Sequence, residues 1–168
     1  VTVADFAGGS QALRAVVGGS ADVVSGAFEH TLNMQAKGQP MRAFVLQGRA
    51  PQIVLAVSTK TMAGYKSVAD LKGKKIGVTA PGSSTNIMSN FVLGKAGIRP
   101  ADVSYVGVGA SQGAVAAMRS GQIDAISNLD PVITILQRAG DIRIVSDTRD
   151  PVESEKVFGG PMPAACFY

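Results

Sequence analysis

The sequence has few of the side chains on which enzymes and metal sites depend. It contains no tryptophan, a single cysteine (Cys166), a single histidine (His30) and only 5% aromatic residues. One cysteine excludes an intrachain disulfide and a cysteine-rich zinc site, and we expect Cys166 to be a buried strand residue. No apolar run is long enough to span a bilayer. The chain shows no signal peptide and no initiating methionine, so we expect an upstream segment to have been removed.

Charged residues are also sparse. They make up 17% of the chain, with a formal net charge of +4. The densest basic run, at 72–75, has only three lysines and precedes an apolar segment, which is typical of a solvated strand edge. Nucleic-acid binders concentrate positive charge and stack bases on aromatic side chains, and this chain does neither. We therefore expect no nucleic-acid partner.

Apolar residues and glycine are what the sequence has in quantity. Apolar residues reach 46%, and glycine fills 20 of 168 positions, a composition common in α/β proteins. Strand and helix signals alternate, and most helices end at a glycine. Strands are predicted at 2–6, 22–25, 42–47, 52–58, 75–79, 103–108, 123–127 and 142–145, and helices at 10–17, 29–37, 68–71, 85–96, 111–119 and 131–139. This alternation predicts parallel sheets flanked by helices.

Two segments about one hundred residues apart follow the same plan. Ser10–Gln11 opens a predicted helix that leads through a Gly-x-x-Asp motif to the strand at 22–25. Ser111–Gln112 opens a second helix that leads through the same motif to the strand at 123–127. Two βαβ units can converge by chance, but a shared order of motifs favours two lobes built alike.

The second half carries several motifs in a recognisable order. They are Asp-Leu-Lys-Gly-Lys-Lys-Ile-Gly-Val at 70–78, Pro-Gly-Ser-Ser-Thr at 81–85, Gly-Gln-Ile-Asp-Ala at 121–125 and Asp-Pro at 130–131. In this order the chain resembles the type-2 periplasmic binding proteins of ABC importers, in the nitrate, sulfonate and taurine (NMT1/THI5-like) branch. The resemblance covers nearly the whole chain. Many relatives carry tryptophan where this chain has Leu129, and family members are considerably longer.

The resemblance implies an α/β, two-lobed periplasmic binding protein type 2 fold. Each lobe would be a mainly parallel sheet flanked by helices. Residues 1–58 are expected to form part of lobe 1, residues 59–147 lobe 2, and residues 148–168 a return segment toward lobe 1. The first strand–helix unit and the C-terminal part of the family fold are expected to be missing.

The loop at 81–86 is the leading candidate for ligand binding. It follows a predicted strand, at the sheet edge where α/β proteins bind ligands, and it opens a helix. The helix would direct free N–H groups and its positive dipole end toward a ligand. The candidate residues are Gly82, Ser83, Ser84, Thr85 and Asn86. A sulfonate, carboxylate, nitrate or phosphate group would fit there, and the alternative is an ordinary hydroxyl-capped helix start.

Other predicted loops at the same sheet edge add four candidates. Phe6 lies on one such loop, and Phe28 could cover an apolar part of the ligand. Glu29 could meet an amine or hydroxyl, although an acid in a first helical turn also suits the helix dipole. Asn128 ends a predicted strand. His30 lacks a partner set for metal binding or catalysis and is expected to be a solvated helix residue.

Together, the residues and the resemblance imply a receptor for a small anionic or zwitterionic solute, such as a sulfonate, nitrate, carboxylate or thiamine precursor. The two lobes would close on the ligand about a hinge near Ser58–Thr59 and the return segment, and would deliver it to the membrane permease of an ABC importer. No catalytic residue, metal or cofactor is expected. The protein is expected to be a monomer and periplasmic or otherwise exported, with a lipid anchor as one arrangement.

Three other classes stay open on sequence alone. A nucleotide-dependent enzyme is disfavoured because Gly113 comes one residue late for a G-x-G-x-x-G motif beginning at Gly107, and no Walker A run is present. A THI5-like thiamine-pyrimidine synthase would have a cysteine-rich stretch, whereas this chain has one cysteine. The effector-sensing domain of a transcription regulator would need a helix-turn-helix upstream.

Overall fold

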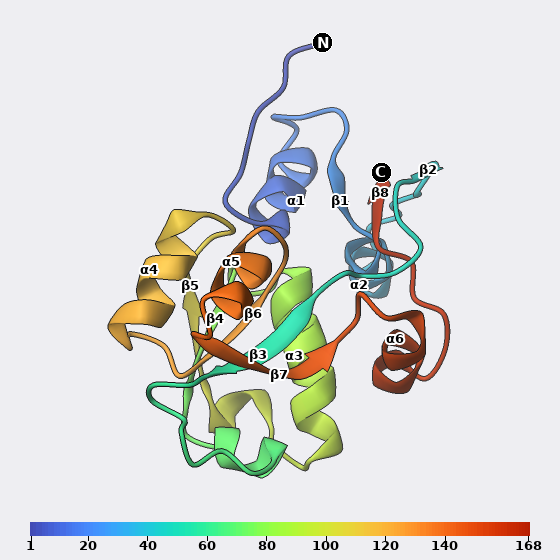
Figure 1. Cartoon of the computed structure of the whole chain (residues 1–168). Coiled ribbons are helices and arrows are strands. Elements are labelled where there is room, and N and C mark those ends of the chain that lie inside the picture. The colour runs from blue at the N-terminus through green and yellow to red at the C-terminus, as the bar shows by residue number, and fades with distance from the viewer.

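The computed structural model describes all 168 residues, Val1–Tyr168. Two sheets, with helices packed on them, make up the molecule (Figure 1). The strands are β1 (Ser25–Ala27), β2 (Val45–Leu46), β3 (Val54–Ser58), β4 (Lys75–Val78), β5 (Ser104–Gly107), β6 (Ala125–Asn128), β7 (Ile142–Asp147) and β8 (Ala165–Phe167). The helices are α1 (Gly9–Val17), α2 (Glu29–Ala36), α3 (Ser84–Lys95), α4 (Gln112–Ser120), α5 (Val132–Arg138) and α6 (Pro151–Phe158), with short 3-10 turns η1 (Val68–Leu71) and η2 (Pro100–Asp102).

The large sheet has the strand order β5-β4-β6-β3-β7. β4 runs parallel to β5 and β6, as the alternation of strands and helices predicts. β3 runs antiparallel to both of its neighbours, β6 and β7. The sheet is therefore mixed rather than mainly parallel, because the apolar residues that identify a strand do not fix its direction.

β3 lies at the centre of the large core. All five of its residues are buried. Leu55 and Val57 join the cluster that includes Met88 of α3, whereas Val54 and Ala56 join the cluster formed with α4 and α5. Alternate side chains of a strand point to opposite faces, so β3 supplies both layers of the core. The large sheet and helices α3 to α5 are called the large lobe below.

The small sheet is antiparallel, with β8 between β1 and β2. Its core consists of Val24, Cys166 and Tyr168, against which Leu13 of α1 and Phe28 pack. Cys166 is buried in a strand, as the sequence predicts. This sheet, with α1 and α2, is called the small lobe below.

The segment 2–6 does not form the predicted strand. Its residues are exposed, belong to no sheet, and extend beyond α1 toward the N-terminus (Figure 1). Apolar alternation becomes a strand only where a sheet edge is available for pairing, and the sequence does not indicate where such edges lie.

The chain passes between the lobes twice, through residues 47–53 and 148–164. The strand at 52–58 is expected in lobe 1, but β3 pairs in the large sheet, so the first crossing precedes Val54. Helix α6 in the second crossing was not predicted. Its start is nevertheless well marked, because the Asp150 side chain accepts a hydrogen bond from Val152 N (2.8 Å) and Pro151 occupies the first turn.

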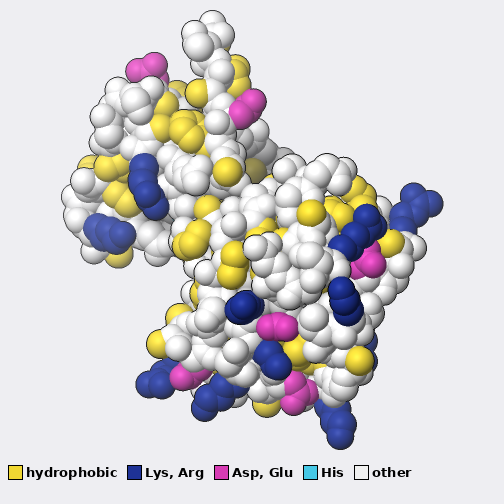
Figure 2. Space-filling view, turned by 90° about the vertical axis from the view of Figure 1, so that its left-hand side faces the viewer, with side chains coloured by type: hydrophobic (Ala, Val, Ile, Leu, Met, Phe, Trp, Pro, Cys, Tyr) yellow, Lys and Arg dark blue, Asp and Glu magenta, His cyan; other side chains and the backbone are white.

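No helix of the structure has both the length and the apolar character needed to cross a membrane. On the face drawn in Figure 2, acidic and basic side chains are interspersed over the large lobe. Lys72 and Lys75 are exposed, as expected for a solvated strand edge.

Candidate functional site

The two lobes meet where α1 begins beside the start of α3. Ser10 donates its backbone N–H to Ser83 Oγ (3.2 Å) and its hydroxyl to the Pro81 carbonyl (3.1 Å). The backbones are so close that a Cβ on Gly8 would lie 2.8 Å from Ala80 Cβ. The start of α1 in the small lobe therefore faces the loop at 81–86, the predicted binding loop.

This loop presents a group of hydrogen-bond donors. Gly82 has a φ of +82°, in the left-handed region that favours glycine, and its N–H bonds to Asn86 Oδ1 (2.9 Å). The amides of Ser84 and Thr85, in the first turn of α3, have no acceptor within the chain, as is general for the first amides of a helix. The buried Nδ2 of Asn86 has no well-aligned hydrogen-bond partner, although the Asn86 side chain lies near enough to the Tyr105 hydroxyl to lower the pKa of that group. These donors lie at the positive end of a 12-residue helix.

Two of the predicted ligand-binding hydroxyls are engaged within the protein. Thr85 is fully buried, and its Oγ1 accepts from Thr79 N (3.1 Å) and hydrogen-bonds to Thr79 Oγ1 (2.9 Å). Ser83 is 1% exposed and bonds to Ser10 of the small lobe. These side chains fix the position of the loop, whereas the first amides of α3 have no acceptor within the chain.

Asn128 also has internal partners. It is fully buried, donates from Nδ2 to the Gly109 carbonyl (2.9 Å) and accepts from Leu129 N at Oδ1 (2.9 Å). It therefore ties the loop after β6 to the loop after β5. Both loops lie at the carboxyl ends of strands in the large sheet, as predicted.

The predicted small-lobe residues differ in exposure. Phe28 and Glu29 are partly buried beside the small-lobe core, and Phe6 is 44% exposed on the segment 2–6. Burial raises the pKa of Glu29, and a hydrogen bond from its own backbone partly offsets the shift. Glu29 is thus an acid that the small lobe holds in a poorly solvated position.

His30 differs from the sequence expectation. It is 1% exposed rather than solvated, and its Nδ1 lies 3.0 Å from the Tyr168 hydroxyl. Its Nε2 is buried without a hydrogen-bond partner. Burial lowers the pKa of His30, and the backbone of Gly82 counteracts part of this shift. No local signal marks His30, because its partner Tyr168 lies 138 residues away.

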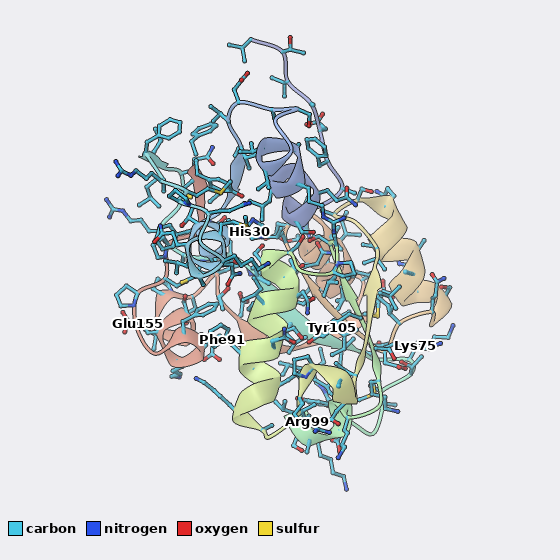
Figure 3. All side chains as sticks on the ribbon, turned by 180° about the vertical axis from the view of Figure 1, so that it is seen from behind. His30, Lys75, Phe91, Arg99, Tyr105 and Glu155 are labelled. Atoms are coloured by element: carbon cyan, nitrogen blue, oxygen red, sulfur yellow. The ribbon has the colours of Figure 1, made fainter.

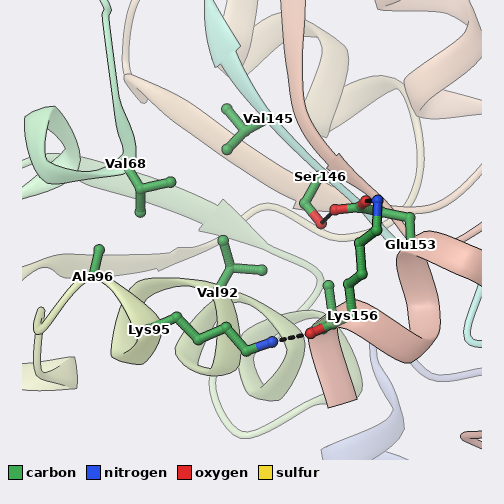
Figure 4. A pocket seen from close by; sticks show the side chains of 9 residues that line it. Val68, Val92, Lys95, Ala96, Val145, Ser146, Glu153 and Lys156 are labelled. Atoms are coloured by element: carbon green, nitrogen blue, oxygen red, sulfur yellow. Dashed lines mark hydrogen bonds and ion pairs between the residues drawn. The ribbon is translucent and has the colours of Figure 1, made fainter. Parts of the chain in front are cut away.

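Two hollows lie away from this contact between the lobes. One, of about 420 Å³, is lined by Gln52, Leu129, Asp130 and Arg149 beside the crossings. The other, of about 330 Å³, lies between α3 and α6, with a floor rich in valine and charged residues at its rim (Figure 4). Neither contains a predicted site residue. The structure has no group of three or more histidine, cysteine, aspartate or glutamate side chains placed to hold a metal ion.

Comparison with known sequences places the chain in a family. The sequence model of the NMT1/THI5-like family matches residues 1–146. The chain belongs to the NMT1/THI5-like family. Among curated relatives, a protein of Brucella abortus (strain 2308), whose name suggests a binding protein, is 46% identical over 70 residues, which are 42% of this chain and 21% of that protein.

Solved structures share the fold of this NMT1/THI5-like chain. A protein of Bordetella bronchiseptica RB50 is 66% identical, with a TM-score of 0.97, over 99% of this chain and 52% of that one. The alkanesulfonate-binding protein SsuA of Xanthomonas axonopodis pv. citri, bound to MOPS, is 27% identical, with a TM-score of 0.71, over 98% of this chain and 53% of its own. The periplasmic nitrate-binding protein NrtA of Synechocystis PCC 6803 is 15% identical, with a TM-score of 0.67, over 96% of this chain and 45% of its own, and shows the fold alone.

The family identity confirms the resemblance stated from the sequence and the α/β periplasmic binding protein fold. SsuA and NrtA are named as binding proteins, for alkanesulfonate and for nitrate, and not as enzymes. The chain spans about half the length of the solved structures, and its match to the curated relatives covers about a fifth of their length.

Proposed function

We propose that the protein is a receptor that binds a small anionic or zwitterionic solute between its lobes and passes it to the permease of an ABC importer. The start of α3 carries this proposal, because the backbone amides of Ser84 and Thr85 lack acceptors there and the buried Nδ2 of Asn86 has no well-aligned one. A sulfonate, nitrate or carboxylate offers several charged oxygens, so one such group would satisfy these donors together. Of the predicted contacts, we retain Gly82, Ser84, Asn86 and the Thr85 amide for direct binding.

The neighbours support this class of ligand. Alkanesulfonate and nitrate, in the names of SsuA and NrtA, are both oxyanions. From the same similarity to SsuA and NrtA, we propose that the protein is exported or periplasmic and that its role needs no chemical step. Glu29 is proposed to meet a ligand amine or hydroxyl, and Phe28 and Phe6 an apolar part.

The hinge is proposed at the two crossings rather than at Ser58–Thr59. Ser58 lies inside the buried β3, where its partners are strands of the large sheet. Gln52, in the first crossing, has a φ of +60°, an uncommon conformation for a residue other than glycine. Short connecting segments of this kind can absorb the backbone rotations of lobe closure.

Thermal unfolding against a solute panel tests the proposal. The protein is unfolded and refolded to remove any carried ligand, and its Tm is followed with alkyl sulfonates, taurine, nitrate, aromatic carboxylates and pyrimidines. A ligand at one hundred times its Kd should raise the Tm by roughly 5–10 °C. A selective, saturable rise supports a solute receptor, and no rise with any solute of the panel contradicts it.

An Asn86→Asp variant tests the location of the site. The carboxylate keeps an acceptor for Gly82 N–H but replaces the free donor with negative charge, which a helix start tolerates. We expect the variant to fold normally and to lose stabilisation by oxyanions. Asn90→Asp, which adds the same charge further along α3, should keep it. Equal stabilisation of both variants by the oxyanion would place the site elsewhere.

A further inference from the structure

The His30 imidazole lies buried at the contact between the lobes, and the proposed function does not use it. Its Nε2 has no partner although the side chain is 1% exposed. Most buried polar atoms in folded proteins are hydrogen-bonded, and an exception calls for a cause. An unpartnered nitrogen on a rigid helix is what a binding site leaves open for its ligand.

The ring lies directly at the contact between the lobes. A Cβ added to Gly9 would lie 2.9 Å from His30 Cε1 and 3.9 Å from Nε2, so the ring packs against the bare backbone at the start of α1. The Gly82 backbone raises the pKa of His30, so its carbonyl faces the ring, although no well-aligned hydrogen bond to Nε2 forms. The N–H of the same glycine is bonded to Asn86 Oδ1. Figure 3 places His30 beside the end of α3 that is remote from Arg99, which is the N-terminal end. The two unpartnered nitrogens, one from each lobe, thus lie near the same glycine.

Tyr168 is the group that can select which ring nitrogen carries the proton, because its hydroxyl lies 3.0 Å from Nδ1. Burial raises the pKa of the Tyr168 hydroxyl, so this group stays protonated and can donate. Its hydrogen-bond partner is His30 Nδ1. When Tyr168 donates to Nδ1, a neutral imidazole carries its proton on Nε2. Burial also lowers the pKa of His30 and so favours the neutral ring.

We propose that His30 is the small lobe's contact with the ligand, donating from Nε2 to the same anionic group that Asn86 Nδ2 and the first amides of α3 bind. Tyr168 is its positioning residue, since it fixes the tautomer without touching the ligand. This inference rests on the proposed function and extends it. An oxyanion held in this way bridges the two lobes, so binding would favour their closed arrangement.

Nitrogen NMR tests the inference directly, because the chain has one histidine and therefore one imidazole signal set. In the ligand-free protein we expect Nε2 to carry the proton and Nδ1 to be unprotonated. Saturation with methanesulfonate, or with the oxyanion that raises the Tm most, should shift the Nε2 resonance far more than Nδ1. A proton on Nδ1 in the ligand-free protein, or an unmoved Nε2 signal at saturation, would overturn the inference.

Variants supply the second measurement. His30→Leu should weaken oxyanion binding about tenfold or more, the loss expected for one hydrogen bond to a charged group. His30→Gln keeps an N–H donor and should recover most of the affinity, even if the leucine variant folds poorly. Tyr168→Phe should weaken binding and mix the two tautomers. Ser154→Ala, which removes another unpartnered buried atom on α6, should bind as the wild type does.

The outcomes separate the two proposals. Binding by wild type with equal affinity in the leucine variant overturns the role of His30 and leaves the receptor proposal intact. No oxyanion binding by wild type overturns the receptor proposal itself, and the role of His30 with it.

Discussion

Thr148 is hydrogen-bonded to both backbone groups of Ile53. Its hydroxyl accepts from Ile53 N (2.9 Å) and donates to the Ile53 carbonyl (2.8 Å), which also accepts from Thr148 N (2.9 Å). Both residues are buried. Ile53 ends the first crossing and Thr148 begins the second, so this pair joins the two connections where they enter the large lobe.

Thr148→Val should destabilise the protein with little change in volume. The variant leaves buried Ile53 N–H without its acceptor, which typically costs about 1–3 kcal/mol. Urea unfolding would measure the loss. Thr61→Val is the matched control, because Thr61 is exposed and its hydroxyl has no hydrogen bond, and a change below about 0.5 kcal/mol is expected there. Equal stability of Thr148→Val and wild type would mean that the Thr148 hydroxyl does not stabilise the contact between the two crossings.

Thr85→Val tests whether this residue holds the binding loop or contacts the ligand. The hydroxyl accepts from buried Thr79 N, so its removal should lower the free energy of unfolding by about 1–2 kcal/mol even without ligand. Chemical denaturation of the ligand-free protein would measure this. An unchanged ligand-free stability with weaker oxyanion binding would instead assign the hydroxyl to the ligand.

Ser83→Ala should loosen the contact between the lobes. Ser10 N–H would lose its acceptor at the start of α1. Hydrogen exchange of the Ser10 amide should become about tenfold faster, equivalent to about 1.4 kcal/mol of local protection. Ser120→Ala removes a hydroxyl that bonds only within α4 and should leave Ser10 exchange unchanged. Unchanged exchange in Ser83→Ala would show that other contacts protect this amide.

Glu29→Gln should stabilise the protein at neutral pH. Because burial raises the native pKa of Glu29 above its ordinary value of 4.5, the native state favours the protonated acid. The contribution of Glu29 to stability is therefore greatest below pH 4.5 and declines as pH rises through the raised native pKa. Unfolding between pH 4 and 8 should show a flatter profile for the variant than for wild type. The exposed Glu155→Gln should keep the wild-type profile, and an unaltered profile in Glu29→Gln would contradict the buried position.

Much of the large lobe can be predicted from local sequence. The helix expected at 85–96 and the strand expected at 75–79 match α3 and β4 within one residue at each end, because their apolar residues and flanking glycines follow the periods of a helix and a buried strand. The family resemblance rests on the same stretch. The local pattern does not show which strands pair or in which direction. For this reason, neither the unpaired segment 2–6 nor the antiparallel direction of β3 could be foreseen.

The candidate site was predictable on one side only. The donors at 82–86 sit in one contiguous loop, and a loop that opens a helix is visible in sequence. The small-lobe side depends on a contact between His30 and Tyr168, which are brought together only when β8 pairs with β1. Likewise, nothing adjacent to Asn128 or Thr85 shows that their polar groups are already taken by Gly109 and Thr79.

The central position of β8 in the small sheet has a consequence for folding. All five strands of the large sheet lie at or before Asp147 in the chain, so that sheet can form without the last residues. The small sheet requires residues 165–167, because β1 and β2 do not pair with each other and each needs β8. Truncation before Ala165 would therefore leave the large sheet whole and dissolve the small one, and α3 would lose the lobe that faces its first turn.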